Sequence, residues 1–160
     1  MPKHSSGLLL FRRGEPGVEV LLVHMGGPFW SHRDAGAWSL PKGEHEADED
    51  SLGAARREFA EELGREAPAG QAIELGTVKQ RSGKLLHAWA LEADLDVSEV
   101  HSNLFELEWP RGSGQRREFP EVDRAEWFAL ATAREKLLSG QQPLLELLLG
   151  RLRGAGPASR

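Results

Sequence analysis

Three carboxylates stand close together near the end of one predicted helix: Glu58, Glu61 and Glu62. At about 100° per residue, Glu61 and Glu62 lie within about 60° of Glu58 around the helix axis, so the three share one face. At the end of a helix the dipole disfavours anions, and like charges four residues apart repel each other. A bound divalent cation would relieve this repulsion, because Mg²⁺ and Mn²⁺ prefer carboxylate oxygens. The competing interpretation is a solvated, charge-rich surface helix.

The stretch that contains these acids, GEHEADEDSLGAARREFAEELG (residues 43–64), predicts a helix from Ser51 to Leu63. It has good helix formers and no proline, and its apolar residues recur at steps of three and four, at Leu52, Ala55, Phe59 and Leu63. Asp48, Glu49 and Asp50 precede the first turn, where the dipole favours negative charge. Glu44 and Glu46 are expected to be solvated, so that glutamine at either position would change little.

The whole segment resembles the Nudix box of the Nudix hydrolase family: Gly, five residues, Glu, seven residues, then Arg-Glu-apolar-X-Glu-Glu-X-Gly. One position departs, since the family usually has an aliphatic residue after the final glycine and this chain has Arg65. The resemblance implies a metal-dependent hydrolase that cuts a pyrophosphate bond in a nucleoside diphosphate joined to another group. The matching residues are Gly43, Glu49, Arg57, Glu58, Phe59, Glu61, Glu62 and Gly64.

The same resemblance implies roles for single residues. Glu58 and Glu62 are expected to bind Mg²⁺ or Mn²⁺, with Glu61 as a third ligand or as the base that acts on water. A backbone carbonyl at Lys42 or Gly43 often joins the coordination in this family. Arg57 is expected to orient the acids through an ion pair with Glu49. The family often recruits a further acid from a distant loop, which here implies Glu118 as a metal ligand, with Glu121 as the alternative.

Substrate contacts are predicted outside the box. Lys42 could bind phosphate, and Trp30, in the loop of residues 25–38, could contact the substrate; the alternatives are a solvated lysine and a ring that covers the core. Arg81, Lys84 and His87 belong to a later hairpin that could line the pocket, although His87 could equally pack beside Trp89.

The substrate itself is indicated only by the approach to the helix. The sequence WSLPKGE resembles the corresponding segment of hydrolases that act on diadenosine and diphosphoinositol polyphosphates. This favours a nucleoside triphosphate or a dinucleoside polyphosphate. The alternative to an enzyme is a regulatory module that binds a nucleotide without cleaving it, but such modules usually lose acids of the box, and this chain has all of them.

The elements around the box predict an α/β fold of the Nudix type, a mixed central sheet sandwiched between helices. Apolar runs at 7–11 and 18–24 predict paired strands. Residues 38–43 predict a short strand, 73–80 and 84–95 a hairpin, 103–109 a strand, 110–123 a long loop, and 125–130 the last strand. Two helices are expected in 131–153. The chain is expected to form one domain over residues 1–153, with a disordered tail at 154–160.

Composition narrows the class of protein. The 160 residues carry a formal net charge of −5, which argues against general binding of nucleic acids. There is no cysteine, so disulfides, thiolate catalysis and cysteine-ligated zinc are excluded. No apolar run is long enough for a signal peptide or a membrane span, and we expect a soluble, cytoplasmic protein. The oligomeric state is left open.

Overall fold

The computed structural model describes residues 3–14, 17–98 and 100–154, and its centre is a seven-stranded mixed sheet. Five strands follow in the order β3 (Trp38–Ser39), β2 (Val18–Met25), β1 (His4–Arg13), β6 (Leu85–Glu92) and β5 (Ile73–Lys79). In addition, β4 (Lys42–His45) pairs with β1, and β9 (Val122–Ala129) pairs with β2. The pairing of β1 with β6 is parallel, whereas β1 with β2 and β5 with β6 are antiparallel.

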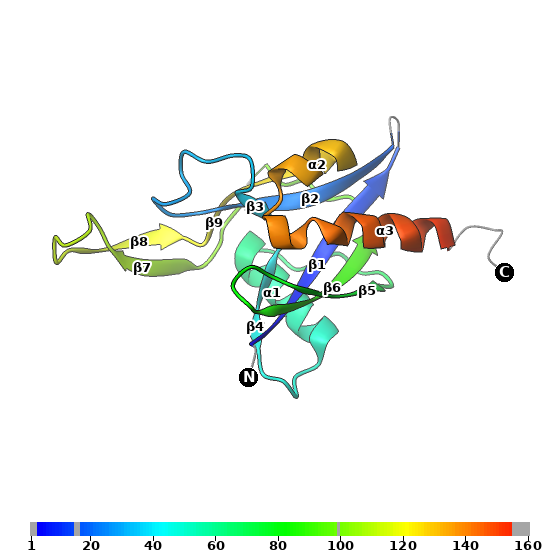
Figure 1. Cartoon of the computed structure of the whole chain (residues 1–160), viewed down its shortest axis with the longest axis horizontal. Coiled ribbons are helices and arrows are strands. Elements are labelled where there is room, and N and C mark those ends of the chain that lie inside the picture. Colours follow the sequence, from blue (N-terminus) through cyan, green and yellow to red (C-terminus); the bar gives the residue numbers. More distant parts are fainter. Residues whose placement is uncertain (1–2, 15–16, 99, 155–160) are drawn as a thin grey trace.

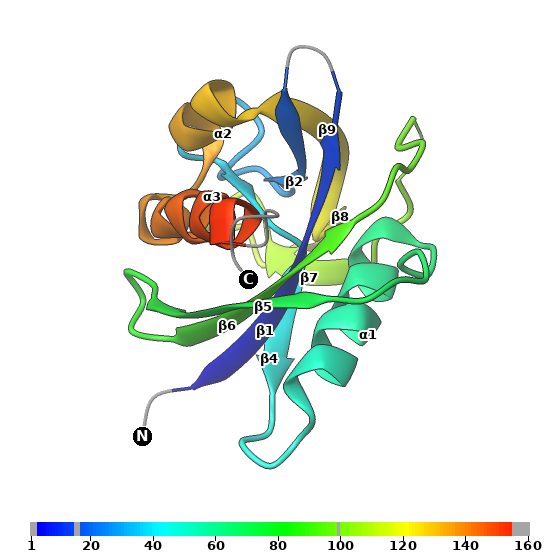
Figure 2. The same cartoon turned by 90° about the vertical axis from the view of Figure 1, so that its right-hand side faces the viewer.

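Alternation along β1 and β2 divides the core into two layers. Leu8, Leu10, Leu21 and Val23 face one helix layer, and Leu9, Phe11, Val20 and Leu22 face the other. Successive side chains of a strand point to opposite faces, so a strand buried on both faces must be apolar throughout. This explains the unbroken apolar runs in the sequence. Figure 2 shows the helices on the two sides of the sheet.

On one face lies α1 (Ser51–Leu63), the predicted acid-rich helix, with Ala55, Phe59 and Leu63 packed on the sheet. Asp50 caps its first turn by accepting a hydrogen bond from the Gly53 N–H at 2.7 Å. The left-handed Gly64, with φ of 76°, ends the helix, and its N–H donates to the Ala60 carbonyl. Arg65, the residue that departs from the box, is exposed and donates to the Asp96 carbonyl at 2.8 Å.

The other face is covered by α2 (Leu130–Lys136), the short 3₁₀ turn η1 (Ser139–Gln141) and α3 (Pro143–Gly154). On α3, Leu144, Leu145 and Leu148 are buried, whereas Leu147 is exposed. The mixed sheet between helix layers confirms the predicted fold class. In the described part of the chain, no helix is long and apolar enough to cross a membrane.

The segment between residues 103 and 123 differs from the prediction. Residues 110–123 were expected to form a loop, but Arg116–Pro120 form a strand, β8, that pairs with β7 (Leu104–Glu108). This two-stranded sheet is separate from the central sheet and projects away from the body of the molecule (Figure 1). The alternation of residues 116–120 is interrupted by adjacent charges and ends in proline, so the strand had no clear sequence signal.

The predicted strand at 38–43 is divided into β3 and β4 around Pro41, whose carbonyl accepts from the Leu8 N–H at 3.1 Å. At the C-terminus, α3 includes Gly154, the first residue of the predicted tail. Residues 155–160 lie outside the described residues.

Candidate active site

The acids of α1 are positioned by its contact with β4. Gly43 pairs with Ser6 of β1, and the Glu58 side chain packs directly on the Gly43 backbone. A Cβ atom at position 43 would lie 1.9 Å from Glu58 Oε1, which is far inside van der Waals contact. Gly43 is not among the residues with positive φ in the described part of the chain, so it is needed for this close approach, not for a special turn.

Gly43→Ala is therefore expected to displace the Glu58 carboxylate and to lower kcat by about 10-fold or more, as expected when a catalytic group shifts by about an ångström. Gly14→Ala is the matched control, because a Cβ at position 14 meets nothing within 4 Å. Steady-state rates and thermal melting of both variants test the expectation. Normal turnover by a folded Gly43→Ala protein would show that the close packing of Glu58 is not required.

The carboxylates open onto a pocket of about 330 Å³ between α1, β4 and the start of β9. Glu58 and Glu62 come from the helix, and Glu121 comes from the residue before β9. The Glu121 backbone is fixed from both sides: its N–H donates to the Asn103 carbonyl, and its carbonyl accepts from the Gly26 N–H, both at 2.9 Å. The lining residues are Ser5, Val23, Met25, Ser39, Lys42, Gly43, Glu44, Glu58, Glu62, Lys84, Glu121 and Val122.

Burial and crowding make these acids hard to ionise. The pKa of Glu62 is raised to about 8, mainly by burial and further by the charges of Glu121 and Glu58, although Lys42 opposes the rise. Burial likewise raises the pKa of Glu58 and of Glu121, and the charge of Glu61 adds to both. A nearby positive charge would favour the ionised form of all three.

Arg57 and Lys42 both bring positive charge to the cluster. Arg57 pairs with Glu49 as predicted, and it also contacts Glu58 at 3.2 Å and Glu61 at 3.6 Å. The pKa of Lys42 is lowered, mainly by its own burial, and the nearby Glu62 opposes this shift.

The carboxylates of Glu58, Glu62 and Glu121 are chemically suited to bind a divalent cation. Carboxylate oxygens are the ligands that Mg²⁺ and Mn²⁺ prefer, and a cation would favour the ionised form of Glu58 and Glu62, whose pKa is raised mainly by burial and further by neighbouring acids. In the ranges that the structure describes, no three His, Asp or Glu side chains already have the arrangement that holds a metal ion.

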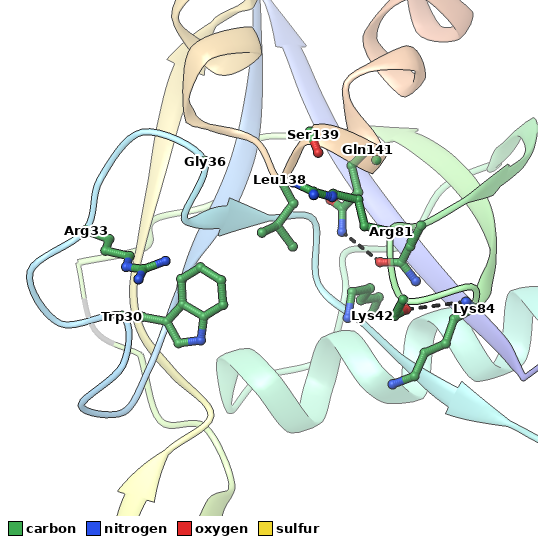
Figure 3. A pocket seen from close by; sticks show the side chains of 12 residues that line it. Trp30, Arg33, Gly36, Lys42, Arg81, Lys84, Leu138, Ser139 and Gln141 are labelled. Atoms are coloured by element: carbon green, nitrogen blue, oxygen red, sulfur yellow. Dashed lines mark hydrogen bonds between the residues drawn. The ribbon is translucent and has the colours of Figure 1, made fainter.

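A second pocket of about 500 Å³ adjoins the first, since Lys42 and Lys84 line both. Trp30 and Leu138 provide its apolar end, as Figure 3 shows. Arg33 stacks over the Trp30 ring with its guanidinium carbon 5.6 Å from the ring centroid. Four of the described lining residues are cations, and none is an acid. The full lining is Trp30, Arg33, Gly36, Lys42, Gln80, Arg81, Ser82, Lys84, Leu138, Ser139, Gly140 and Gln141.

The structure thus brings together most of the residues predicted for the site, but it places three of them elsewhere. His87 pairs with Glu74 at 2.6 Å, stacks on Trp89, and lines a separate pocket beside His45. Glu118 is exposed on β8, opposite Glu106, and does not line the acidic pocket; Glu121 is the acid of this segment that does.

Glu61, the third of these residues, also does not line the acidic pocket, although its charge acts on Glu58 and Glu121. Its Oε1 accepts a long hydrogen bond, 3.4 Å, from Asn103 Nδ2, and its backbone carbonyl accepts from the Asn103 N–H. It is therefore adjacent to the cluster and exposed to solvent on another side.

Glu44 is exposed, as expected for a solvated acid, but it also takes part in the site. Its carboxylate pairs with Lys84 at 2.6 Å and with Lys3 at 3.7 Å, and it lines the acidic pocket. Glu46 is exposed, as predicted. The sequence could not distinguish the two, because the partner Lys84 lies on a hairpin 40 residues further along the chain.

Eight lining residues of the larger pocket were not predicted, among them Arg33, Gln80, Ser139 and Gln141. Arg33 lies in the loop that was predicted to contact substrate through Trp30 and could have been weighed with it. Gln141 is fully buried in η1, and nothing in the local sequence distinguishes it from a surface glutamine.

The comparisons with known proteins agree with this geometry. The model of the NUDIX domain family matches residues 1–148. No match was found among curated proteins.

Several solved structures share the fold. A binary complex of a C. elegans Ap4A hydrolase is 22% identical, with a TM-score of 0.64, over 94% of this chain and 98% of that one. The NUDIX domain of Shewanella oneidensis NrtR, complexed with ADP ribose, is 19% identical, with a TM-score of 0.65, over 95% and 89%. A mutT/nudix family protein from Listeria innocua is 17% identical, with a TM-score of 0.62, over 96% of both chains.

The likenesses at these identities concern the fold alone, whereas the family model spans nearly the whole chain and includes the box and both pockets. The chain belongs to the NUDIX family of pyrophosphohydrolases.

Proposed function

We propose that this protein uses Mg²⁺ or Mn²⁺ to hydrolyse a pyrophosphate bond within the polyphosphate chain of a nucleotide, either a nucleoside triphosphate or a dinucleoside polyphosphate. The observation that carries this proposal is the pair of adjoining pockets. One is lined by acids and suits metal ions, the other is lined by cations and suits phosphates, and Lys42 and Lys84 belong to both.

The charge of each side chain in the two pockets suggests its role. Glu58, Glu62, Glu121 and the Gly43 carbonyl are the groups that would hold the metal, which when bound supplies charge neutralisation on the phosphates and an activated water. Arg57 holds Glu49, Glu58 and Glu61 in place through its three ion pairs. Lys84 is kept at the boundary of the two pockets by Glu44. Glu61, exposed beside the cluster, is the candidate to accept the proton of the attacking water.

The nucleoside is assigned to the apolar end of the larger pocket, at Trp30 and Leu138. This placement leaves the phosphates to run past Lys84 and Lys42 toward the acids. Among the fold relatives, one is an Ap4A hydrolase and another was crystallised with ADP ribose, so both kinds of substrate belong in the test.

Trp30→Ala is expected to raise KM by about 10-fold, the effect of losing one base–aromatic stack, while kcat falls less. The matched control is Trp109→Ala, since Trp109 packs on Phe29 outside the described lining of this pocket. Steady-state kinetics on the best nucleotide substrate measure both constants. A fall in kcat at unchanged KM would remove the nucleoside from this end of the pocket.

The bond that is cut is tested in ¹⁸O-labelled water with a panel of nucleoside triphosphates, dinucleoside polyphosphates and ADP ribose. We expect the label on a phosphate product, and its position identifies the phosphorus that water attacks. A free nucleoside as product would contradict the proposal. Tight nucleotide binding without turnover on any member of the panel would instead support the non-catalytic regulatory module.

A further inference from the structure

A buried histidine that lines neither pocket makes contact with a wall of each. His24, on β2, is fully buried, and its ring packs edge-on against the buried Trp38 with the ring centroids 5.1 Å apart. Its Nε2 lies 2.7 Å from the Arg33 backbone carbonyl, and its Nδ1 lies 2.8 Å from Asp123 Oδ1. A carbonyl and a carboxylate are both acceptors, so both ring nitrogens of His24 act as donors. The ring therefore joins two segments that are far apart in the sequence.

The first of these segments is the loop that forms one wall of the larger pocket. Arg33 and Trp30 line that pocket together, and both are labelled in Figure 3. The Arg33 N–H donates to the Trp30 carbonyl at 2.9 Å, which closes the turn that carries both side chains. The next residue, Asp34, accepts from Trp38 Nε1 at 2.9 Å. Two buried rings, those of His24 and Trp38, thus hold this turn from the inside of the molecule.

The second segment is the start of β9, beside the acidic pocket. Where β9 passes His24 it contains one extra residue, Asp123, which forms a β-bulge. The effect of the bulge is visible in the core, because Val122 and Ala125 both pack in the layer of α1. In a regular strand, side chains three residues apart point to opposite faces. The bulge therefore sets the direction of the chain that precedes it, and that chain carries Glu121 into the lining of the acidic pocket.

We propose that His24 is a positioning residue of the active site. Through the Arg33 carbonyl it holds the wall that receives the nucleoside, and through Asp123 it holds the bulge that directs Glu121 to the metal. Because one rigid ring makes both contacts, the nucleoside end and the metal end of the site keep a fixed relation to each other. The inference rests on the proposed function and deepens it, by assigning a role to a residue outside both pockets.

The two contacts can be removed one at a time. The amide nitrogen of glutamine lies as many bonds from Cβ as Nε2 of histidine, and that of asparagine as many as Nδ1. His24→Gln therefore keeps a donor for the Arg33 carbonyl and loses the contact with Asp123, whereas His24→Asn does the reverse. Asp123→Ala removes the second contact from a side chain that is 33% exposed, and it leaves the buried ring in place.

We expect the losses to divide between metal and nucleotide. His24→Gln and Asp123→Ala should each weaken Mn²⁺ binding by about 10-fold in calorimetry, the lower end of what is lost with groups that orient metal ligands. Their affinity for α,β-methylene ADP, whose P–C–P bridge cannot be hydrolysed, should stay near that of the wild type in chelator. His24→Asn should weaken binding of this analogue by about 10-fold, the effect of leaving one buried carbonyl unpaired, and should bind Mn²⁺ normally.

Kinetics on the best substrate of the panel should show the same division. His24→Gln and Asp123→Ala are expected to lower kcat, and His24→Asn is expected to raise KM. A residue that only stabilised the fold would lower the melting temperature of the variants without separating the two constants. Asp94→Ala is the control, since Asp94 also pairs with a cation, Arg12, at 2.8 Å, but lies outside the described linings of both pockets.

Three results would overturn the proposal in whole or in part. Equal losses of Mn²⁺ and nucleotide affinity in all three variants would refute the division between the two contacts. Unchanged Mn²⁺ affinity in Asp123→Ala would refute the role of the bulge, even if neither His24 variant folds. A His24→Asn protein that does not fold would show that the Arg33 contact serves the fold and not the nucleoside wall.

Neither binding assay needs turnover, so the proposed function and the role of His24 can fail separately. A protein that shows the expected division of Mn²⁺ and nucleotide binding but cleaves no substrate would reject the proposed function and keep the positioning role of His24. A protein that turns over normally in all three variants would keep the proposed function and reject that role.

Discussion

Glu58→Gln and Glu62→Gln are each expected to lower kcat by about 10² or more, the effect of removing a principal electrostatic contact from an active site. Both carboxylates line the acidic pocket, and glutamine keeps their size while it removes the charge. The two variants should also lose the rise in melting temperature that Mg²⁺ or Mn²⁺ gives the wild-type protein, because a ligand stabilises only the state that binds it. Steady-state kinetics and metal-dependent melting measure the two effects separately.

The control for this pair is Glu46→Gln, since Glu46 is exposed and outside the described lining of the acidic pocket. Glu44 is unsuitable as a control because of its ion pair with Lys84. We expect Glu46→Gln to retain wild-type turnover and wild-type metal stabilisation. A similar loss in all three variants would mean that the general acidity of the segment matters, and that the box residues have no special role.

Removal of divalent cations is expected to abolish turnover, and either Mg²⁺ or Mn²⁺ should restore it. The physical reason is that burial, and secondarily the charges of neighbouring acids, raise the pKa of Glu58, Glu62 and Glu121, and a bound cation would favour their ionised forms. Hydrolysis of the substrate panel is measured in chelator and after each metal is added back. Full turnover in chelator would exclude a metal role.

Ca²⁺ provides the matched comparison in the same assay. It is larger and accepts more ligands in looser geometry, whereas Mg²⁺ requires near-octahedral coordination. Binding without turnover in Ca²⁺ is expected, and it would separate the neutralisation of charge from the geometry that hydrolysis needs. Equal activity in all three metals would indicate that neutralisation alone is sufficient.

Much of the fold could be predicted because its signals are local. The helix was found from Ser51 to Leu63, as expected, and Ala55, Phe59 and Leu63 of its predicted apolar stripe are buried, whereas Leu52 is only partly buried. The paired strands at β1 and β2 were equally clear, since a strand buried on both faces is apolar throughout. The strand β8 was missed because charged, exposed residues form it, and only the pairing with β7 stabilises it.

The active site also has features that the sequence predicted and features that only the structure revealed. By itself, the sequence determined the acid face of the helix, because spacing along one helix fixes which side chains are neighbours. The resemblance to the box predicted the family and the ion pair of Arg57 with Glu49. Only the tertiary structure decided that Glu121 and not Glu118 lines the acidic pocket and that Glu44 pairs with Lys84. Those contacts join residues at least 40 positions apart, and their geometry is set by the packing of the sheet between its two helix layers, which no local pattern encodes.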